Sequence, residues 1–357
     1  MAGTIDDMKP VRDRVTAPPT FQPSHPLITR WRPATFDDVD SVLPLMQAID
    51  SADHPNYVLT REELEEEFGY SFVDLATDSL IGFTADGVPV ALGLVVMPPL
   101  QETLVRCFLY GGVHPNHRGR GIGRELLVWQ RTRAEQRFAA SDKRLPAWTM
   151  ASADARAPQS ERLLRHAGFE AVRYFAGLER DLADPIELVD PSENVRIVPF
   201  TDALSGKALI ARTDSFRDHW GSQPMSDEQW QAWLDGTFRA DISFLAVVDG
   251  NADEGGEREG SAGEEVVGFV LCQVNEDDWE TQGFSGAYIG MVGTTRAHRG
   301  RRIAPALLSR TLAACAAQGW QRVTLDVDSA SPTGALGLYT RMGFVQTNSE
   351  TSLVRVY

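Results

Sequence analysis

The sequence predicts an α/β protein that contains two copies of one domain. Its 357 residues are enough for two domains of ordinary size, each with its own core. A basic, glycine-containing segment occurs twice, as HRGRGIG at 117–123 and as HRGRRIA at 298–304. Apolar runs and amphipathic segments follow the same order around both copies. A single repetition at this long spacing is typical of a duplicated domain rather than of a solenoid.

The elements of the two halves can be matched one by one. In the first half the predicted elements are, in order, a strand over 28–32, a helix that begins at Thr35, a hairpin over 79–97, a strand over 104–113 and a helix over 123–136. In the second half they are a strand over 195–202, a helical region, a hairpin of strands over 244–250 and 264–272, a strand over 287–294 and a helix over 304–319. Each half closes with a short helix, a glycine that ends it (Gly168, Gly343) and a phenylalanine that starts a strand.

The domain limits follow from composition. Residues 1–26 are rich in proline and have no periodic apolar face, which predicts a disordered or extended arm. We expect an N-terminal domain over 27–183, a linker over 184–194 that contains proline and acidic residues, and a C-terminal domain over 195–357. The glycine-rich, acidic stretch 250–265 stands where a hairpin needs only a turn, and is predicted to be a flexible loop.

Composition and charge exclude several classes of protein. A hydrophobic fraction of 43% and a charged fraction of 24% are typical of a folded soluble protein. The net charge of −16 opposes general binding to nucleic acid or to an anionic membrane. The N-terminus carries charges and prolines where a signal peptide needs an apolar core, and the longest apolar run, 88–99, is too short for a membrane helix. We therefore expect a cytoplasmic protein without nucleic-acid or membrane partners.

The three cysteines, Cys107, Cys272 and Cys315, are too few and too far apart for a disulfide framework or a zinc site. They are predicted to be small buried hydrophobic residues in a reducing compartment. No metal is expected.

Each basic segment joins an apolar strand to the start of a helix. This arrangement directs backbone N–H groups and the positive end of the helix dipole toward one point, as phosphate sites do. Gly119, Gly121 and Gly123 allow positive φ angles and a close approach of phosphate oxygens. A diphosphate ligand is expected. The spacing fits neither a Rossmann turn nor a P-loop, and a nucleic-acid arm would need interleaved aromatic residues.

Residues 118–123, RGRGIG, match the signature [QR]-x-x-G-x-[GA] of the GNAT superfamily of acyl-CoA-dependent N-acetyltransferases. The stretch SPTGALGLYTRMGF at 331–344 is similar to a later motif of that family, a helix with a tyrosine followed by Gly-Phe. The resemblance covers nearly the whole chain from residue 28 onward, twice. The tandem arrangement resembles that of mycothiol synthase and its relatives.

The resemblance implies two tandem GNAT folds, each a mixed six- to seven-stranded sheet that is splayed at its centre and flanked by helices. Acetyl-CoA would be the cosubstrate, with its pantetheine in the splay and its diphosphate on the basic loop. Carried over by position, the cofactor-binding residues are Gly111, Gly112, Val113, Arg118, Gly119, Arg120, Gly121, Ile122 and Gly123 in the first half, and Val292, Gly293, Thr294, Arg299, Gly300, Arg301, Arg302, Ile303, Ala304 and Ser331 in the second.

The same resemblance implies that a tyrosine on the later helix protonates the departing thiolate. This residue is Tyr339 in the second half, whereas the first half has Leu164 at the same distance before Gly-Phe. The C-terminal domain is therefore expected to be catalytic, although Tyr339 could instead be a core aromatic. Arg302 replaces the central glycine of the signature. If that position needs a left-handed backbone, arginine costs roughly 1–2 kcal/mol, which weakens binding without abolishing it.

The general base and the acceptor site are less defined. Glu280 is the predicted base, with Asp326 and Asp328 as alternatives, because bases of this family act from that strand region. The segment 215–238 would form the lip of the acceptor cleft, with His219 and Trp220 facing the substrate. Trp230 and Trp233, three residues apart, are expected to pack on the sheet.

The predicted function is transfer of an acetyl group from acetyl-CoA to a primary amine of a small molecule. Two alternatives remain open: transfer to a protein or peptide N-terminus or lysine, and a CoA-binding regulator without turnover. A monomer or weak homodimer is expected, because two fused copies already form an internal pair.

Overall fold

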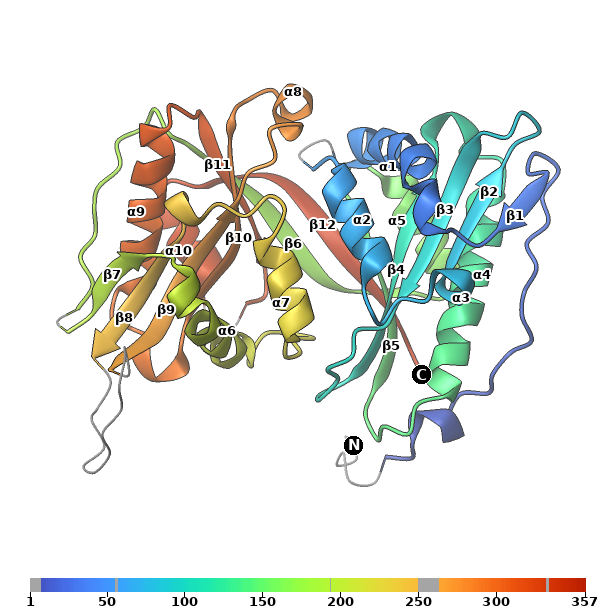
Figure 1. The fold of residues 1–357 in the computed structure, drawn as a ribbon, viewed down its shortest axis with the longest axis horizontal. Helices are drawn as coiled ribbons and strands as arrows, with labels where there is room; N and C mark the ends of the chain where they lie inside the picture. Colours follow the sequence, from blue (N-terminus) through green and yellow to red (C-terminus); the bar gives the residue numbers. More distant parts are fainter. Residues whose placement is uncertain (1–7, 55–56, 193, 250–262, 332–333) are drawn as a thin grey trace. The chain divides into compact units, whose positions relative to one another are not determined.

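The computed structural model describes residues 8–54, 57–192, 194–249, 263–331 and 334–357. These residues form two compact units (Figure 1). Unit 1 consists of Met1–Tyr174 together with Ser349–Tyr357, and unit 2 consists of Phe175–Asn348. Most of the predicted acidic loop lies outside the described residues. Its last members, Glu264 and Glu265, already belong to a strand.

Unit 1 is a six-stranded mixed sheet between helices. Its strand order is β1-β2-β3-β4-β5-β12, and all neighbours are antiparallel except β4 and β5. The strands are β1 (Arg30–Arg32), β2 (Ser79–Phe83), β3 (Pro89–Val96), β4 (Val105–Val113), β5 (Ala147–Asp154) and β12 (Val345–Val356). The helices are α1 (Val39–Asp53), α2 (Arg61–Gly69), α3 (Leu75–Asp78), α4 (Ile122–Ala139) and α5 (Pro158–His166).

Alternation along β3 divides the core of unit 1 into two layers. Leu92 and Leu94 pack with apolar residues of α1 and α2, while Ala91 and Val95 pack with those of α4. The sheet is therefore buried on both faces, and the end of β4 and the start of α4 meet at one edge.

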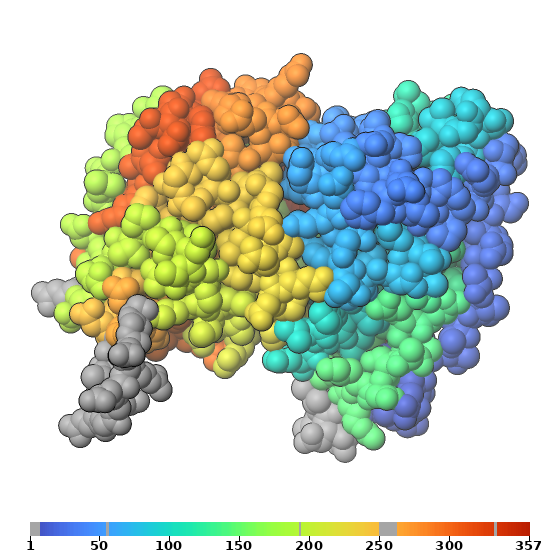
Figure 2. All heavy atoms as spheres, viewed as in Figure 1, coloured from blue at the N-terminus to red at the C-terminus, as the bar shows by residue number. Residues whose placement is uncertain are grey.

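Unit 2 repeats this plan in the order β6-β11-β10-β9-β8-β7, where β10 and β11 form the parallel pair. Its strands are β6 (Glu170–Asp181), β7 (Arg196–Pro199), β8 (Phe244–Asp249), β9 (Glu264–Gln273), β10 (Gly286–Thr294) and β11 (Arg322–Asp328). Its helices are α6 (Asp202–Phe216), α7 (Asp227–Leu234), α8 (Asp278–Gln282), α9 (Ile303–Ala317) and α10 (Ala335–Arg341). The side chains of α6 and α7 cover one face of this sheet (Figure 2), and α9 covers the other.

The last strands of the two halves are exchanged between the units. Residues Phe175–Asp181 of β6 pair with β11 of unit 2, although β6 ends the first half of the sequence. Residues Glu350–Val356 of β12, the end of the second half, pair with β5 of unit 1. The compact units therefore differ from the predicted limits 27–183 and 195–357. Both strands pair antiparallel with the last parallel strand of a sheet, so the pattern of apolar residues does not distinguish one destination from the other.

Each sheet is splayed at its parallel pair, as the fold prediction requires. In unit 1, β4 and β5 pair only from Val105 to Phe108, and β4 then continues along β3 to Val113. In unit 2, β10 pairs with β11 only from Gly286 to Tyr288, and then continues along β9 to Thr294 past a register shift between Ile289 and Met291. The predicted mixed, splayed sheets flanked by helices are confirmed.

Two connecting segments are packed along helices. Val11 and Val15 are buried in the core of unit 1, so the irregular residues 8–26 are packed on the domain, and of the two predicted states, disordered or extended, they are closer to the extended arm. A side-chain amide of α4, that of Gln136, donates to the carbonyl of Pro18 at 3.1 Å. The predicted linker is held in the same way, because Val189 N–H donates to the hydroxyl of Ser309 on α9 at 3.1 Å.

Several local predictions are confirmed. Thr35 forms a capping box with Asp38 ahead of α1, and Gly168 and Gly343 end their helices with φ angles of +84°. Trp230 is buried against the sheet, and all three cysteines are buried thiols. Among the described residues, no helix combines the length and the apolar character that crossing a membrane requires.

Candidate active site

The first basic loop is shaped to receive an anion. It leaves β4, makes a 3-10 turn at Pro115–His117 and enters α4 at Ile122. Gly119 and Gly121 have φ angles of +74° and +97°, and Gly121 is the N-cap of α4. Within the described ranges, the backbone N–H groups of residues 119–123 donate to no other backbone group. These free donors at a helix N-terminus fit a diphosphate.

The second basic loop has the same course with one strained residue. It makes a 3-10 turn at Arg296–His298 and enters α9 at Ile303, with Gly300 at a φ angle of +80°. Arg302 is the N-cap of α9 and has φ +56° and ψ +23°, which is the left-handed region. The signature position therefore requires this conformation in both units, and arginine adopts it at a cost of roughly 1–2 kcal/mol.

The first arginine of each signature anchors its loop. The Arg118 guanidinium binds both carboxylate oxygens of Asp53 at 2.5 and 3.0 Å, and also donates to the carbonyl of Val113. Arg299 donates to the carboxylate of Asp218 at 3.0 Å and to the carbonyl of Ser215 at 3.1 Å. Both guanidinium groups thus tie the loop to the end of α1 or α6. Because both guanidinium groups are engaged in these bonds, only the backbone of Arg118 and Arg299 is available to contact a diphosphate.

The other loop arginines have exposed side chains. Arg120, Arg301 and Arg302 make no ion pair within the described parts of the chain. Each loop is also held from behind at one matched carbonyl. The His25 ring nitrogen Nε2 lies 2.7 Å from the carbonyl oxygen of Arg120, and Ser192 N–H donates to the carbonyl of Arg301 at 3.1 Å. The arm and the linker therefore support equivalent loops.

The strand residues expected to meet pantetheine border the splay. Residues 111–113 of β4 pair with 91–93 of β3, and residues 292–294 of β10 pair with 268–270 of β9. Across the described residues, no strand pairs with their other edge. Both predicted backbone segments therefore present one open edge at the end that leads into a basic loop.

Tyr339 lies on α10 in the core of unit 2. Its ring contacts Phe344 edge to face at a centroid distance of 5.7 Å, and its side chain is 7% exposed. Burial raises the pKa of Tyr339 to about 12, so the phenol keeps its proton at neutral pH. A protonated phenol is what a general acid must supply.

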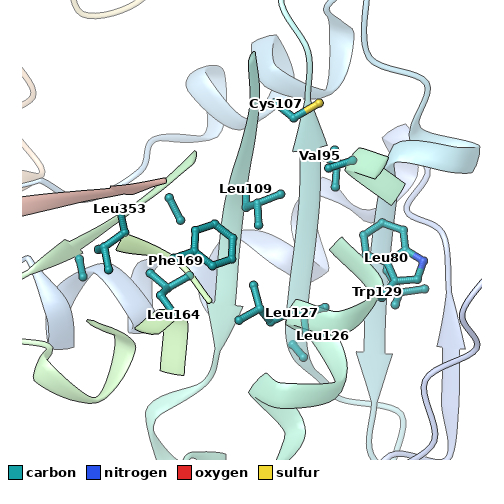
Figure 3. Close-up of a cluster of buried hydrophobic side chains, with 14 of the residues drawn as sticks. Leu80, Val95, Cys107, Leu109, Leu126, Leu127, Trp129, Leu164, Phe169 and Leu353 are labelled. Carbon is teal, nitrogen blue, oxygen red and sulfur yellow. The ribbon is translucent and has the colours of Figure 1, made fainter. Parts of the chain in front are cut away.

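Leu164 occupies the equivalent place in unit 1. The N–H of Phe169 donates to the carbonyl of Leu164 at 3.1 Å, as the N–H of Phe344 donates to that of Tyr339 at 3.0 Å. Leu164 lies among apolar side chains near Phe169 and Leu353 (Figure 3). Unit 1 therefore has a buried leucine, which cannot donate a proton, at the position where unit 2 has a tyrosine.

His219 lies close to charged groups of the second loop. Its ring is tilted against Phe216 at a centroid distance of 4.6 Å. Burial, followed by the positive charge of Arg299, lowers the pKa of His219, while Asp328 at the end of β11 acts in the opposite sense. His219 is therefore neutral at pH 7 and lies near the segment that follows the splay. Its neighbour Trp220 is partly buried.

The comparisons with known proteins agree with this geometry. Residues 210–344 match the model of the acetyltransferase (GNAT) family. The chain therefore contains a GNAT acetyltransferase domain. It is 28% identical over 240 residues to a mycothiol acetyltransferase of Thermobispora bispora, an alignment that covers 66% of this chain and 71% of that protein.

Solved GNAT structures share the tandem fold. A GCN5-related N-acetyltransferase of Sphaerobacter thermophilus superposes with a TM-score of 0.64 at 22% identity, covering 96% of this chain and 97% of the other. A tandem GNAT protein from the clavulanic acid biosynthesis pathway gives a TM-score of 0.64 at 14% identity, covering 92% and 98%. At these identities the similarity shows the fold alone.

The structure places the predicted base of this GNAT protein apart from the loop. Glu280 is exposed on α8, which precedes the N-terminal end of β10, whereas the basic loop follows the C-terminal end. A group that the sequence did not single out lies at the splay instead. The Tyr288 hydroxyl donates to Oδ2 of Asp326 at 3.1 Å. Only the strand pairing reveals Tyr288, because the sequence does not show where β10 and β11 separate.

The left-handed arginine yields a matched pair of variants. Arg302→Gly is expected to increase the free energy of unfolding of unit 2 by about 1 kcal/mol, because glycine adopts this conformation without strain. Gly121→Arg, at the equivalent N-cap of α4, should lower the free energy of unfolding of unit 1 by a similar amount. Denaturant unfolding of both variants measures the two changes. Equal stability of Arg302→Gly and the parent would contradict the assigned strain.

Proposed function

We propose that this GNAT protein transfers an acetyl group from acetyl-CoA to a primary amine of a small molecule, and that unit 2 carries out the reaction. The observation that carries the proposal is the buried, protonated Tyr339 in the unit where the other copy has Leu164. Tyr339 on α10 belongs to the same unit as the splay of β10 and the second basic loop.

The chain's residues divide the work as follows. The free N–H groups at the start of α9 bind the diphosphate, and the open edge of β10 binds pantetheine. The amine nitrogen forms a bond to the thioester carbonyl carbon, and the C–S bond breaks. The hydroxyl of Tyr339 gives its proton to the departing sulfur, and a base accepts the proton that the amine loses. N–H groups near the splay stabilise the negative charge on the carbonyl oxygen.

A small acceptor is supported by the similarity to a mycothiol acetyltransferase. The net charge of −16 favours the approach of a cationic amine. Unit 1 keeps a complete signature without an acid, which supports a second CoA site that does no chemistry. A cytoplasmic location and a monomeric or weakly dimeric state stay predictions from the sequence.

The alternative is a CoA-binding regulator without turnover. Arg302 supports it, because the unit that holds the acid departs from the signature glycine at this position, and unit 1 has Leu164 in place of the tyrosine. This alternative shares the CoA sites with the proposal but needs no acceptor.

One experiment separates these functions. Titration calorimetry with CoA measures binding, and thiol release from acetyl-CoA is followed with a panel of small primary amines and short peptides. Binding together with thiol release for a small amine is the expected result. Binding without thiol release for any acceptor would favour the regulator, release only with peptides would favour the protein acceptor, and no binding would refute every version.

A further inference from the structure

We propose that Asp326 accepts the proton of the acceptor amine in unit 2 and that Tyr288 positions its carboxylate. The inference rests on the proposed acetyl transfer and names the acid–base group on the amine side of that reaction. It selects Asp326, one of the alternatives that the sequence offered, in place of Glu280.

The position of the pair follows from strand register. Tyr288 is paired with Thr324 in the last pair before β10 and β11 separate. Asp326 follows Thr324 by two residues, so it lies on the same face of β11, one step into the splay. The hydrogen bond of 3.1 Å from the Tyr288 hydroxyl to Asp326 Oδ2 therefore joins the two strands where their backbones separate.

Both side chains are accessible to a substrate. Tyr288 is 38% exposed, and Asp326 is exposed as well. Glu280 is also exposed, but it lies on α8, ahead of β10 and outside the splay. Of the two acids, Asp326 is the one that borders the splay in which an acyl group would be held.

Unit 1 shows what the same place contains without this chemistry. Its last pair before the separation is Phe108 with Met150, and the residue two further along β5 is Ser152. A phenyl ring and a hydroxyl thus stand where unit 2 has a phenol and a carboxylate. Unit 1 also has Leu164 in place of Tyr339. Only unit 2 therefore has side chains that can accept and donate a proton at these two positions.

The chemistry balances with these two groups. A carboxylate at the splay attracts an alkylammonium ion and removes its proton, which then resides on Asp326. The freed lone pair forms the C–N bond, the C–S bond breaks, and the sulfur takes the proton of Tyr339. The hydrogen bond from Tyr288 fixes one carboxylate oxygen, so that the other is directed toward the amine. After the C–N bond has formed, the nitrogen gives its surplus proton through solvent to the Tyr339 phenolate, and Asp326 releases the proton of the ammonium ion to solvent, which restores both groups.

The test compares two small amines that differ in their need for a base. Ethanolamine is protonated at neutral pH, whereas methoxyamine is largely unprotonated and needs no base before it attacks. Asp326→Asn should lower kcat/KM for thiol release with ethanolamine by about 10²–10⁴-fold. With methoxyamine, the kcat/KM of this variant should stay close to that of the parent. Tyr288→Phe should lower kcat/KM about tenfold with ethanolamine and leave it unchanged with methoxyamine, because the variant loses one charge-assisted hydrogen bond.

Two further measurements make the result decisive. Ser152→Ala, at the equivalent place in unit 1, is the matched control, and CoA binding by calorimetry shows that each variant is folded. Equal losses with both amines would refute a base role for Asp326. So would a loss in Glu280→Gln together with full activity in Asp326→Asn. A parent protein that binds CoA but releases no thiol with these two amines or with any other acceptor of the panel would refute the proposed transferase function, and the inference with it.

Discussion

Tyr339→Phe is expected to lower kcat for thiol release by about 10²–10⁴-fold, because the variant loses the proton donor for the departing sulfur. The ring that packs on Phe344 remains, so stability and CoA binding should stay at the parent values. Since burial raises the pKa of Tyr339 to about 12, its ionisation should not lower the rate of the parent until the pH approaches that value. Stopped assays with a thiol reagent measure the rate.

The control for this prediction lies in unit 1. Leu164→Phe makes an apolar change at the equivalent position and should leave turnover unchanged, because unit 1 is proposed to do no chemistry. Full activity of Tyr339→Phe would remove the assignment of the general acid. Loss of turnover in Leu164→Phe with intact folding would instead move the chemistry to unit 1.

The exchange of last strands predicts that core substitutions act on the opposite half of the sequence. Leu353 on β12 is fully buried in the core of unit 1, and Leu178 on β6 is 2% exposed in the core of unit 2. Leu353→Ala should destabilise unit 1 by about 2–5 kcal/mol, and Leu178→Ala should destabilise unit 2 by a similar amount. Hydrogen exchange of the full chain, read separately for β4 and β10, measures both effects.

Each leucine variant is the control for the other. Under the exchange, Leu353→Ala loosens β4 while β10 keeps its protection, and Leu178→Ala does the reverse. The opposite pattern, with each variant loosening the strand of its own half, would show that the strands are not exchanged in solution.

Most of the fold could be predicted from local signals. The turn at Asp86-Gly87, the capping residue Thr35 and the glycines at 168 and 343 act through backbone preferences of a few neighbouring residues, and the structure confirms them. The left-handed N-cap of α9 was predictable for the same reason, because the copy in unit 1 has glycine there. Repetition of the elements then implied two similar sheets.

The strand exchange could not be predicted in this way. β6 and β12 each pair antiparallel with the last parallel strand of a sheet, so either strand suits either sheet and their own residues do not decide between them. The same limit applies to the candidate site. Tyr288 and Asp326 lie far apart in the sequence and on different strands, and only the register of β10 on β11 brings them within 3.1 Å. The packing of the predicted arm at 8–26 could not be read from its composition, because Val11 and Val15 show no periodic apolar pattern.

The exchanged strands also restrict how such a protein can be truncated or built into chimeras. A gene fragment that encodes residues 195–357 would produce β11 without β6, and the exposed edge of β11 would be open to pairing with β12 of the same fragment or with another chain. Chimeras that swap one catalytic module between relatives would need two crossover points, near 174 and 348, rather than a single junction at the linker. Each compact unit thus draws its strands from both halves of the sequence.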